Sequence, residues 1–384
     1  MNEMEIENPF FTSNSIPADY FCDRARETEE IIRILTNGNN LVLKGSRRMG
    51  KSGLIRHIFD DPRIKERYNT FYFDIYDTSS LREFTFLLGR AVYQSLASRG
   101  KKAADGFIGM LKSLSGHLAP DPVSGVWGFS FGLQQIERPE LTLQEIFTYL
   151  EQSDRPCLVA IDEFQQIDEY EEKRVDAKLR TLIQWMNNTK FIFSGSERHM
   201  LDILFESEDR PFFRSTRSMT LGPLDEAVYT EFACRMFHKF GRTLDEKAVG
   251  ALYGTFDGTT YYLQAIMNEA FSRTPKGGSC SVDDGLNALS ALIEAYTSQA
   301  QDILVRLPQA QKRLLFALAF SGPTEAITST PYIQQFGLGS ASSVQSAARA
   351  LMGKKIIRRQ GKTYSISDYY LSLWITSHYG AVSY

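Results

Sequence analysis

Cysteine and histidine are scarce in this sequence, and neither is clustered. Four cysteines and five histidines are spread over 384 residues, and no two cysteines have the C-x-x-C spacing of many zinc and redox sites. We therefore expect neither a zinc site nor a disulfide framework. Widely separated, reduced thiols are typical of cytoplasmic proteins, so we expect a cytoplasmic location.

Long apolar runs and an excess of one charge are also lacking. No stretch reaches the 18 apolar residues of a membrane-spanning helix, and the acidic N-terminus has no signal-peptide core. We expect no membrane partner. A formal net charge of -3 excludes a global attraction to nucleic acid, so any DNA binding must come from a local basic patch. The length and the 43% hydrophobic content predict two or three folded domains.

What the sequence does contain is a phosphate-binding loop. Gly45, Gly50, Lys51 and Ser52 fit the spacing G-x-x-x-x-G-K-[ST]. The glycines let successive backbone N–H groups point at one anion, and the helix that follows offers its positive N-terminal end. We predict ATP as the ligand, with Lys51 at the β- and γ-phosphates and Ser52 at Mg²⁺. The predicted nucleotide-binding residues of the loop are Gly45, Ser46, Arg47, Arg48, Met49, Gly50, Lys51, Ser52 and Gly53.

The surroundings of the loop support this interpretation. Residues 40–44 predict a buried strand, and Leu54, Ile55 and Ile58 mark one face of a helix. This is the strand–loop–helix order that the motif requires. A glycine-rich turn without a ligand is the weaker interpretation.

A second apolar strand, predicted at 156–163, ends in two acids. A strand buried on both faces carries adjacent acids only where it emerges at the carboxyl edge of the sheet, beside the phosphate-binding loop. We predict that Asp162 binds Mg²⁺ and that Glu163 orients and deprotonates the attacking water. An acidic helix cap is the weaker interpretation.

Other side chains are candidates for contacts with the nucleotide. Ser194 and Ser196 end the next predicted strand, and either hydroxyl could contact the γ-phosphate or its water. Arg214 precedes the last predicted strand, at 219–224, and could supply positive charge to the γ-phosphate within the same chain. Arg210 and Arg217 compete for that role.

The segment before the first strand is placed to wrap the base of the nucleotide. Phe21 and Arg24 are the candidates for this contact. A core anchor and a surface charge are the competing interpretations.

Strands and helices alternate in the first half of the chain, which predicts an α/β fold with a parallel sheet. Residues 123–131 predict a short β insertion. Gly222-Pro223 marks a boundary, and helical patterns follow, including one helix at 285–304. We divide the chain into a P-loop ATPase domain (1–221), a helical lid (222–307) and a winged helix (308–384) with its hairpin turn at Gln360-Gly361.

The third helix of the predicted winged helix is almost uncharged on its outward side. Ser342, Ser343, Gln345 and Ser346 are neutral, and Arg349 is the one cation. Because DNA readers depend on several phosphate contacts, we favour a protein partner over DNA. DNA stays open because the wing is basic, with Lys354, Lys355, Arg358, Arg359 and Lys362.

Together these motifs resemble the archaeal-type ATPases of the STAND branch of the AAA+ superfamily. Residues 45–52 are similar to that family's G-x-R-R-x-G-K-[ST], and similar segments occur at 158–163, 193–196, 211–214 and 364–374. The resemblance implies a slow, ATP-hydrolysing switch whose lid and winged helix move with the nucleotide state. Gly258-Thr-Thr-Tyr261 stands where such proteins often carry a Gly-x-Pro that contacts nucleotide.

Two other functions compete with the switch. The first is an ATP-regulated DNA-binding transcriptional regulator. The second is a small-molecule kinase, which is weaker because the Asp162-Glu163 pair suits activation of water and no second substrate pocket is visible in the sequence.

Overall fold

The computed structural model describes residues 6–13, 16–114, 133 and 136–380, and the β insertion predicted at 123–131 lies outside them. The chain forms two compact units. The first, here called the sheet unit, comprises Phe11–Phe232 and Gly258–Tyr262. The second, the helical unit, comprises Met1–Phe10, Ala233–Asp257 and Leu263–Tyr384. A lid distinct from the winged helix remains our proposal for the organisation inside the helical unit.

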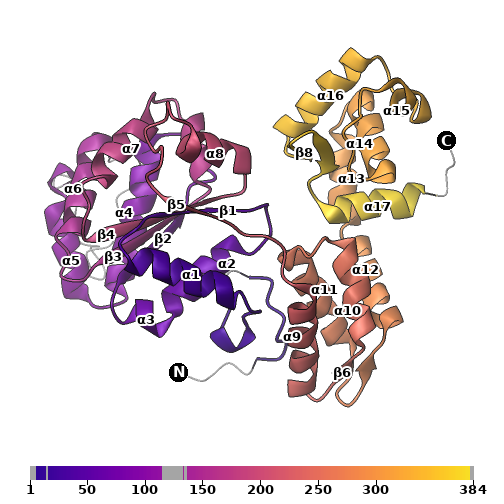
Figure 1. The fold of residues 1–384 in the computed structure, drawn as a ribbon, viewed down its shortest axis with the longest axis horizontal. Coiled ribbons are helices and arrows are strands. Elements are labelled where there is room, and N and C mark those ends of the chain that lie inside the picture. Colours follow the sequence, from indigo (N-terminus) through magenta and orange to yellow (C-terminus); the bar gives the residue numbers. More distant parts are fainter. Residues whose placement is uncertain (1–5, 14–15, 115–132, 134–135, 381–384) are drawn as a thin grey trace, which may run out of the picture. The chain divides into compact units, whose positions relative to one another are not determined.

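The sheet unit is built on five parallel strands in the order β2-β3-β4-β1-β5 (Figure 1). Their bounds are β1 Leu41–Lys44, β2 Asn69–Asp74, β3 Cys157–Asp162, β4 Thr189–Gly195 and β5 Arg217–Thr220. Asp74 pairs with Asp162, and Leu43 pairs with Ser194. The predicted α/β sheet is therefore confirmed, and its carboxyl edge gathers the ends of the strands that carry the candidate residues.

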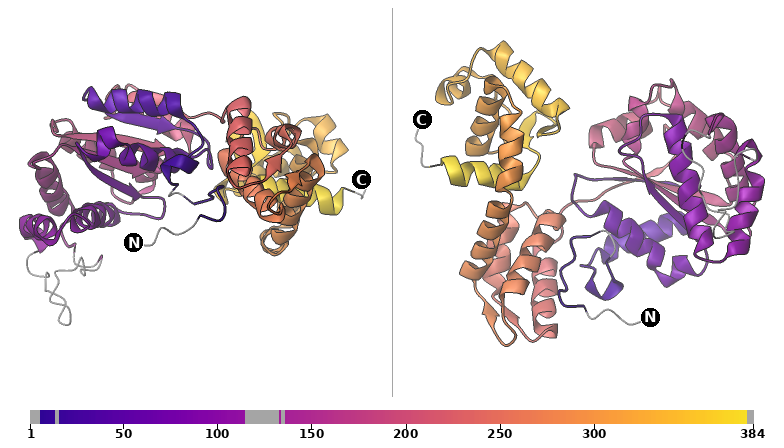
Figure 2. Two further views of the ribbon diagram at one scale, coloured as in Figure 1. Left: turned by 90° about the horizontal axis from the view of Figure 1, so that it is seen from below. Right: turned by 180° about the vertical axis from the view of Figure 1, so that it is seen from behind.

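Helices cover both faces of this sheet (Figure 2), which explains why β1 and β3 are buried along their whole length. Leu158 and Ala160 of β3 belong to one apolar core, and Val159 and Ile161 belong to the other. Successive side chains of a strand point to opposite faces, so each strand serves both cores. The helices are α1 Ala25–Thr36, α2 Lys51–Asp60, α3 Pro62–Lys65, α4 Leu81–Ala97, α5 Lys101–Met110, α6 Pro139–Glu151, α7 Val175–Ile183 and α8 Arg198–Glu206.

In the helical unit, the helix predicted at 285–304 is two helices. They meet at Tyr296, whose ring packs against Tyr370 and whose hydroxyl donates to Asp368. These contacts anchor the junction in a way that periodicity alone does not reveal. The first elements are α9 Glu226–Lys239, which begins in the sheet unit, β6 Thr243–Leu244, α10 Glu246–Thr255, α11 Thr260–Arg273, β7 Ser279–Cys280, α12 Val282–Ala295 and α13 Thr297–Val305.

The C-terminal part is a winged helix, as predicted. Three helices, α14 Gln309–Ser321, α15 Thr330–Gln335 and α16 Ala341–Gly353, precede the antiparallel hairpin of β8 Ile357–Gln360 and β9 Thr363–Ile366. Gly361 in the hairpin turn has a φ of 62°, a conformation that glycine adopts without strain. A further helix, α17 Tyr369–Tyr379, packs against α12, α13 and α14. Among the helices of the described residues, none has the length and apolarity that a bilayer crossing requires.

Candidate nucleotide-binding site

The loop between β1 and α2 is tightly held at its start. A Cβ at Gly45 would lie 2.9 Å from the carbonyl oxygen of Leu221, so only glycine fits there without a shift. Leu221 in turn donates its N–H to the carbonyl of Lys44 at 2.7 Å. Arg48 and Gly50 have φ angles of 68° and 89°, which curl the loop over the start of α2. This is the shape of a loop that cradles an anion.

Lys51 is buried within this loop, with 5% of its surface exposed. Its ammonium group donates to the carbonyls of Gly45, at 2.9 Å, and Ser46, at 3.2 Å. Burial lowers the pKa of Lys51, and the negative charges of Glu163 and Asp162 oppose that shift. A phosphate group in the loop would meet a poorly hydrated cation, which is where a charge-assisted hydrogen bond is strongest.

Asp162, at the end of β3, accepts hydrogen bonds from several directions. Its Oδ2 accepts from the Ser52 hydroxyl at 2.5 Å and from the Tyr72 hydroxyl at 2.6 Å. Its Oδ1 accepts from the Ser194 hydroxyl and from the backbone N–H of Glu163. A hydroxyl and a carboxylate at hydrogen-bond distance beside a phosphate-binding loop are suitable oxygen ligands for Mg²⁺. The residues present therefore fit the predicted metal.

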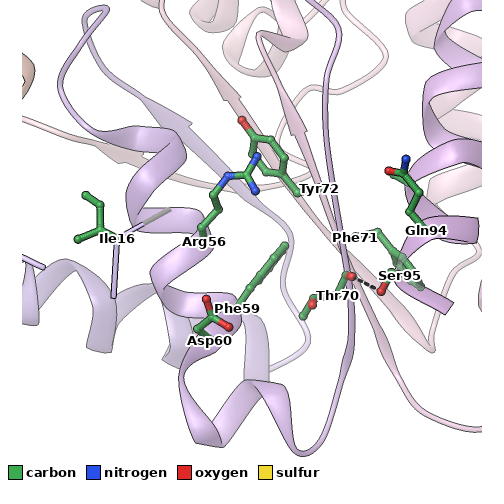
Figure 3. A pocket seen from close by; sticks show the side chains of 10 residues that line it. Ile16, Arg56, Phe59, Asp60, Thr70, Phe71, Tyr72, Gln94 and Ser95 are labelled. Carbon is green, nitrogen blue, oxygen red and sulfur yellow. Dashed lines mark hydrogen bonds between the residues drawn. The ribbon is translucent and has the colours of Figure 1, made fainter. Parts of the chain in front are cut away.

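Tyr72 was missed by sequence reasoning. It lies on β2, and burial raises the pKa of its hydroxyl, which keeps the group protonated and a donor. The Arg56 guanidinium of α2 lies 4.3 Å from the centroid of its ring. Figure 3 shows these two side chains beside one another, in a pocket of about 280 Å³. Tyr72 could be recognised as a site residue only from the pairing of β2 with β3, and that pairing follows only from the strand order.

Glu163 is held by three donors that converge on one oxygen. Its Oε2 accepts from Gln165 Nε2 at 2.6 Å, from the Ser196 N–H at 3.1 Å and from the Ser196 hydroxyl at 2.7 Å. A Cβ at Gly195 would lie 2.0 Å from Gln165 Oε1, so glycine is needed for this approach. The two candidate serines thus have different partners: Ser194 contacts Asp162, and Ser196 contacts Glu163.

The first residues of α11 contact the phosphate-binding loop within the sheet unit. The Thr260 hydroxyl donates to the carbonyl of Met49 at 3.1 Å, and the N–H of Tyr261 donates to the carbonyl of Arg48 at 3.1 Å. The Arg48 guanidinium lies 5.2 Å and 5.0 Å from the ring centroids of Tyr261 and Tyr262, and it donates to the Tyr262 hydroxyl. The segment that replaces Gly-x-Pro therefore binds the loop itself.

Comparison with known protein families identifies both parts of the chain. Residues 21–266 match the model of an ATPase domain predominantly from Archaea. The chain belongs to this ATPase family. Residues 298–377 match the model of a probable winged helix domain. No curated protein matches the sequence.

Solved structures share the fold at low identity. The Walker-type ATPase paby2304 of Pyrococcus abyssi is 17% identical, with a TM-score of 0.62, over 96% of this chain and 99% of that one. The ORC2 protein of Aeropyrum pernix, solved as ADPNP and ADP complexes, is 13% identical, with a TM-score of 0.55, over 93% of this chain and 96% of that one. These likenesses show the same P-loop fold, and the family match supports ATPase activity.

The structure does not bring Arg214, expected to supply charge to the γ-phosphate within the same chain, to the phosphate-binding loop. Strand β5 pairs with β1 so that Arg217 lies beside Leu41, at the amino ends of both strands. The phosphate-binding loop follows the other end of β1, on the order of 13 Å away along four residues. The backbone N–H of Arg214 donates to Phe205, and its guanidinium lies over the Phe213 ring. The sequence shows that Arg214 precedes β5, but it does not show at which edge of the sheet Arg214 lies.

Arg198 is a cation that sequence reasoning overlooked. It is the first residue of α8, which begins shortly after the last residue of β4, Gly195. Burial is the main cause of the lowered pKa of Lys51, and the positive charge of Arg198 adds to that shift. The Arg198 guanidinium donates to the carbonyl of Leu221 at 3.5 Å. The chain therefore has an arginine beside its phosphate-binding loop, at the carboxyl edge of the sheet.

The two residues expected near the base of the nucleotide have different surroundings. The Phe21 ring stacks on His57 of α2 with 4.0 Å between centroids, and its Cε2 would lie 3.9 Å from a Cβ at Gly53. Arg24 is buried and donates to Glu27 at 2.7 Å and to the carbonyls of residues 222 and 223 at 2.8 and 3.2 Å. Phe21 thus lies beside the loop helix, and Arg24 joins α1 to the chain after β5. Base contact by either residue stays a prediction.

The nearby Asp74 provides a test by pH. Desolvation is the main reason why the pKa of Asp74 is raised from 3.8 to about 6, and the charges of Asp162 and Glu163 add to the shift. A backbone hydrogen bond from Tyr76 opposes it. The folded state then holds this proton more tightly than the unfolded state, so the parent loses stability as the pH rises from about 4 to about 6. Without nucleotide, the unfolding free energy of Asp74→Asn relative to that of the parent should therefore rise from pH 4 to pH 7, as measured by urea unfolding. An identical difference at both pH values would contradict this.

Proposed function

We propose that this protein is an ATP-hydrolysing molecular switch of the STAND kind, in which the nucleotide state controls α11 and, through it, the helical unit. The observation that carries the proposal is the contact of the first residues of α11 with the loop. Thr260 and Tyr261 donate to loop carbonyls, and the Tyr262 hydroxyl accepts from the Arg48 guanidinium. Because α11 continues to Arg273, a change in the loop acts on a helix that extends into the helical unit. The cysteines are all free, which supports a cytoplasmic setting.

In the proposed reaction, the loop N–H groups and Lys51 bind the phosphates of ATP. Ser52 and Asp162 would hold Mg²⁺, and Phe21 would lie at the base. Mg²⁺, when bound, neutralises charge on the β- and γ-oxygens. Glu163 takes a proton from the water that attacks the γ-phosphate, which gives ADP and phosphate.

Three neighbours would assist this chemistry. Ser196 orients the carboxylate of Glu163, and Ser194 orients that of Asp162, as their hydrogen bonds suggest. Arg198 adds positive charge near the γ-phosphate in place of Arg214. Positive charge at that point stabilises the transition state of phosphoryl transfer.

The switch is tested by removing one hydroxyl. Hydrogen exchange in residues 258–273 should differ between the ADP state and the state with a non-hydrolysable ATP analogue. Tyr262→Phe should reduce that difference, because it keeps the ring but loses the acceptor for Arg48. Tyr261→Phe is the matched control and should behave like the parent. Equal exchange in the two nucleotide states of the parent would refute the switch.

A protein partner is the more strongly supported target of the winged helix. Ser342, Ser343, Gln345 and Ser346 on α16 are exposed and neutral. Two wing cations have partners within the wing: Arg358 donates to Ser365, and Arg359 donates to the carbonyl of Gly361. Arg349 is the one cation of α16, so this helix offers few contacts to phosphates. The ORC1 protein of Aeropyrum pernix was solved with DNA, which keeps an ATP-regulated DNA-binding regulator as the alternative.

A further inference from the structure

A groove of about 640 Å³ lies within the helical unit, away from the wing hairpin. Its walls come from α13 and α14, with contributions from the end of α15 and the end of α17 (Figure 1). The volume is in the range of binding pockets rather than of packing defects. Its apolar lining residues are Leu304, Val305, Phe316, Ala317, Phe320, Phe336 and Tyr379.

Helix α14 presents a complete face to this groove. Gln309, Lys312, Arg313, Phe316 and Phe320 recur at the spacing of one helical face. The opposite face, with Leu314, Leu315 and Leu318, is buried in the winged-helix core. The groove face is about 17 Å long, or three turns. Its spacing suits a second amphipathic helix laid against it, with contacts one turn apart.

The floor of the groove is apolar and preformed. Val305 is 79% exposed and lies among other apolar lining residues, and contiguous apolar surface of this kind marks interaction sites. The Phe316 ring packs edge-on against Tyr379, with 4.9 Å between centroids, so the aromatic wall is already in place. Duplex DNA offers no apolar surface of this shape. A protein segment with aliphatic side chains does.

The charges of the lining specify the chemistry of the occupant. Lys312 and Arg313 line one stretch of the groove, and the described lining residues include no carboxylate. A partner that covers the apolar floor would desolvate these cations, which is favourable only if it brings opposite charge. The occupant must therefore combine apolar and acidic side chains.

We propose that this groove binds an acidic amphipathic helix of a partner protein. The helix would place apolar residues at i, i+4 and i+7 over Val305 and Phe316, and Asp or Glu residues toward Lys312 and Arg313. This proposal extends the proposed switch function, and it depends on that function for its biological purpose. Groove binding is measured without nucleotide, so its failure is distinguishable from failure of the switch.

The test starts from an unbiased selection. A library of helical peptides displayed on phage is selected on the full-length protein and depleted on the double variant Lys312→Glu, Arg313→Glu. Enriched peptides should share three apolar positions at helical spacing flanked by Asp or Glu. Fluorescence anisotropy of the best peptide should show at least about tenfold weaker binding to the double variant. Val305→Asp, at an exposed position, should also weaken binding, whereas Lys276→Glu, outside the groove lining, should not.

Several outcomes would overturn the proposal. One is no enrichment, and another is a consensus without acids. A third is equal weakening by Lys276→Glu. If the parent is a dimer in light scattering and Val305→Asp makes it a monomer, a second copy covers the groove instead. If the parent binds duplex DNA and the Lys312 and Arg313 double variant loses that binding, the groove serves DNA.

Discussion

Replacing Lys51 with alanine is expected to abolish measurable ATP binding while the protein stays folded. The ammonium lies buried inside the loop, so its loss removes the cation that would contact the β- and γ-phosphates. Loss of a buried, charge-assisted contact costs on the order of 3 kcal/mol, which is about a hundredfold in affinity. Calorimetric titration with Mg²⁺ and ATP measures the effect.

The fold should survive this change because the sheet and its two apolar cores do not depend on Lys51. Thermal unfolding and circular dichroism check that. Lys65→Ala, an exposed lysine on α3, is the matched control and should bind ATP like the parent. If folded Lys51→Ala binds ATP as tightly as the parent, the loop is not the nucleotide site.

Replacing Glu163 with glutamine should leave ATP binding nearly unchanged and reduce turnover by roughly a hundredfold or more. The amide has the size of the carboxylate, and its oxygen can still accept from Ser196 and Gln165. It cannot take a proton from water, so only the chemical step is lost. Phosphate release and ATP affinity, measured on the same preparation, separate the two effects.

Glu197→Gln is the control, because Glu197 is an exposed acid next to Ser196. Its turnover should match that of the parent. If Glu163→Gln hydrolyses ATP at the parental rate and Glu197→Gln does not, the base is Glu197, and the role assigned to Glu163 is wrong.

The parts of the site that could be predicted from the sequence are those fixed by local pattern. An apolar strand that stops at Gly45 and one that stops at Asp162 each place their polar ends at the carboxyl edge of a parallel sheet. The two motifs therefore predict that Ser52 and Asp162 lie at the same edge of the sheet, and the structure brings them into contact there.

Strand order decided what could not be predicted. Tyr72 reaches Asp162 because β2 is the neighbour of β3. Arg214 lies away from the loop because β5 runs parallel to β1 and begins at the opposite edge of the sheet. Neither neighbour relation is encoded in the residue pattern of the strand concerned. Strand β2 alternates buried and half-buried side chains and β5 is mostly exposed, but neither pattern indicates which strand lies beside it.

The contact of α11 with the loop was beyond local reasoning for a different reason. Thr260 and Met49 are 211 residues apart in the sequence. The Gly-x-Pro motif that would have indicated the contact is absent. The structure instead uses a hydroxyl, a backbone N–H and the stacking of Arg48 on two tyrosines. These are common side chains with many ordinary roles, so their spacing carried no signal.

The central claim is that this chain binds ATP at the loop of residues 45–53 and hydrolyses it with Glu163. The most direct measurement is phosphate release from ATP by the purified parent, with Mg²⁺ and with excess EDTA, alongside Lys51→Ala and Glu163→Gln. The account predicts slow, Mg²⁺-dependent release by the parent and none above background in the other three conditions. Release that persists in both variants, or its absence from a parent that binds ATP, would contradict it.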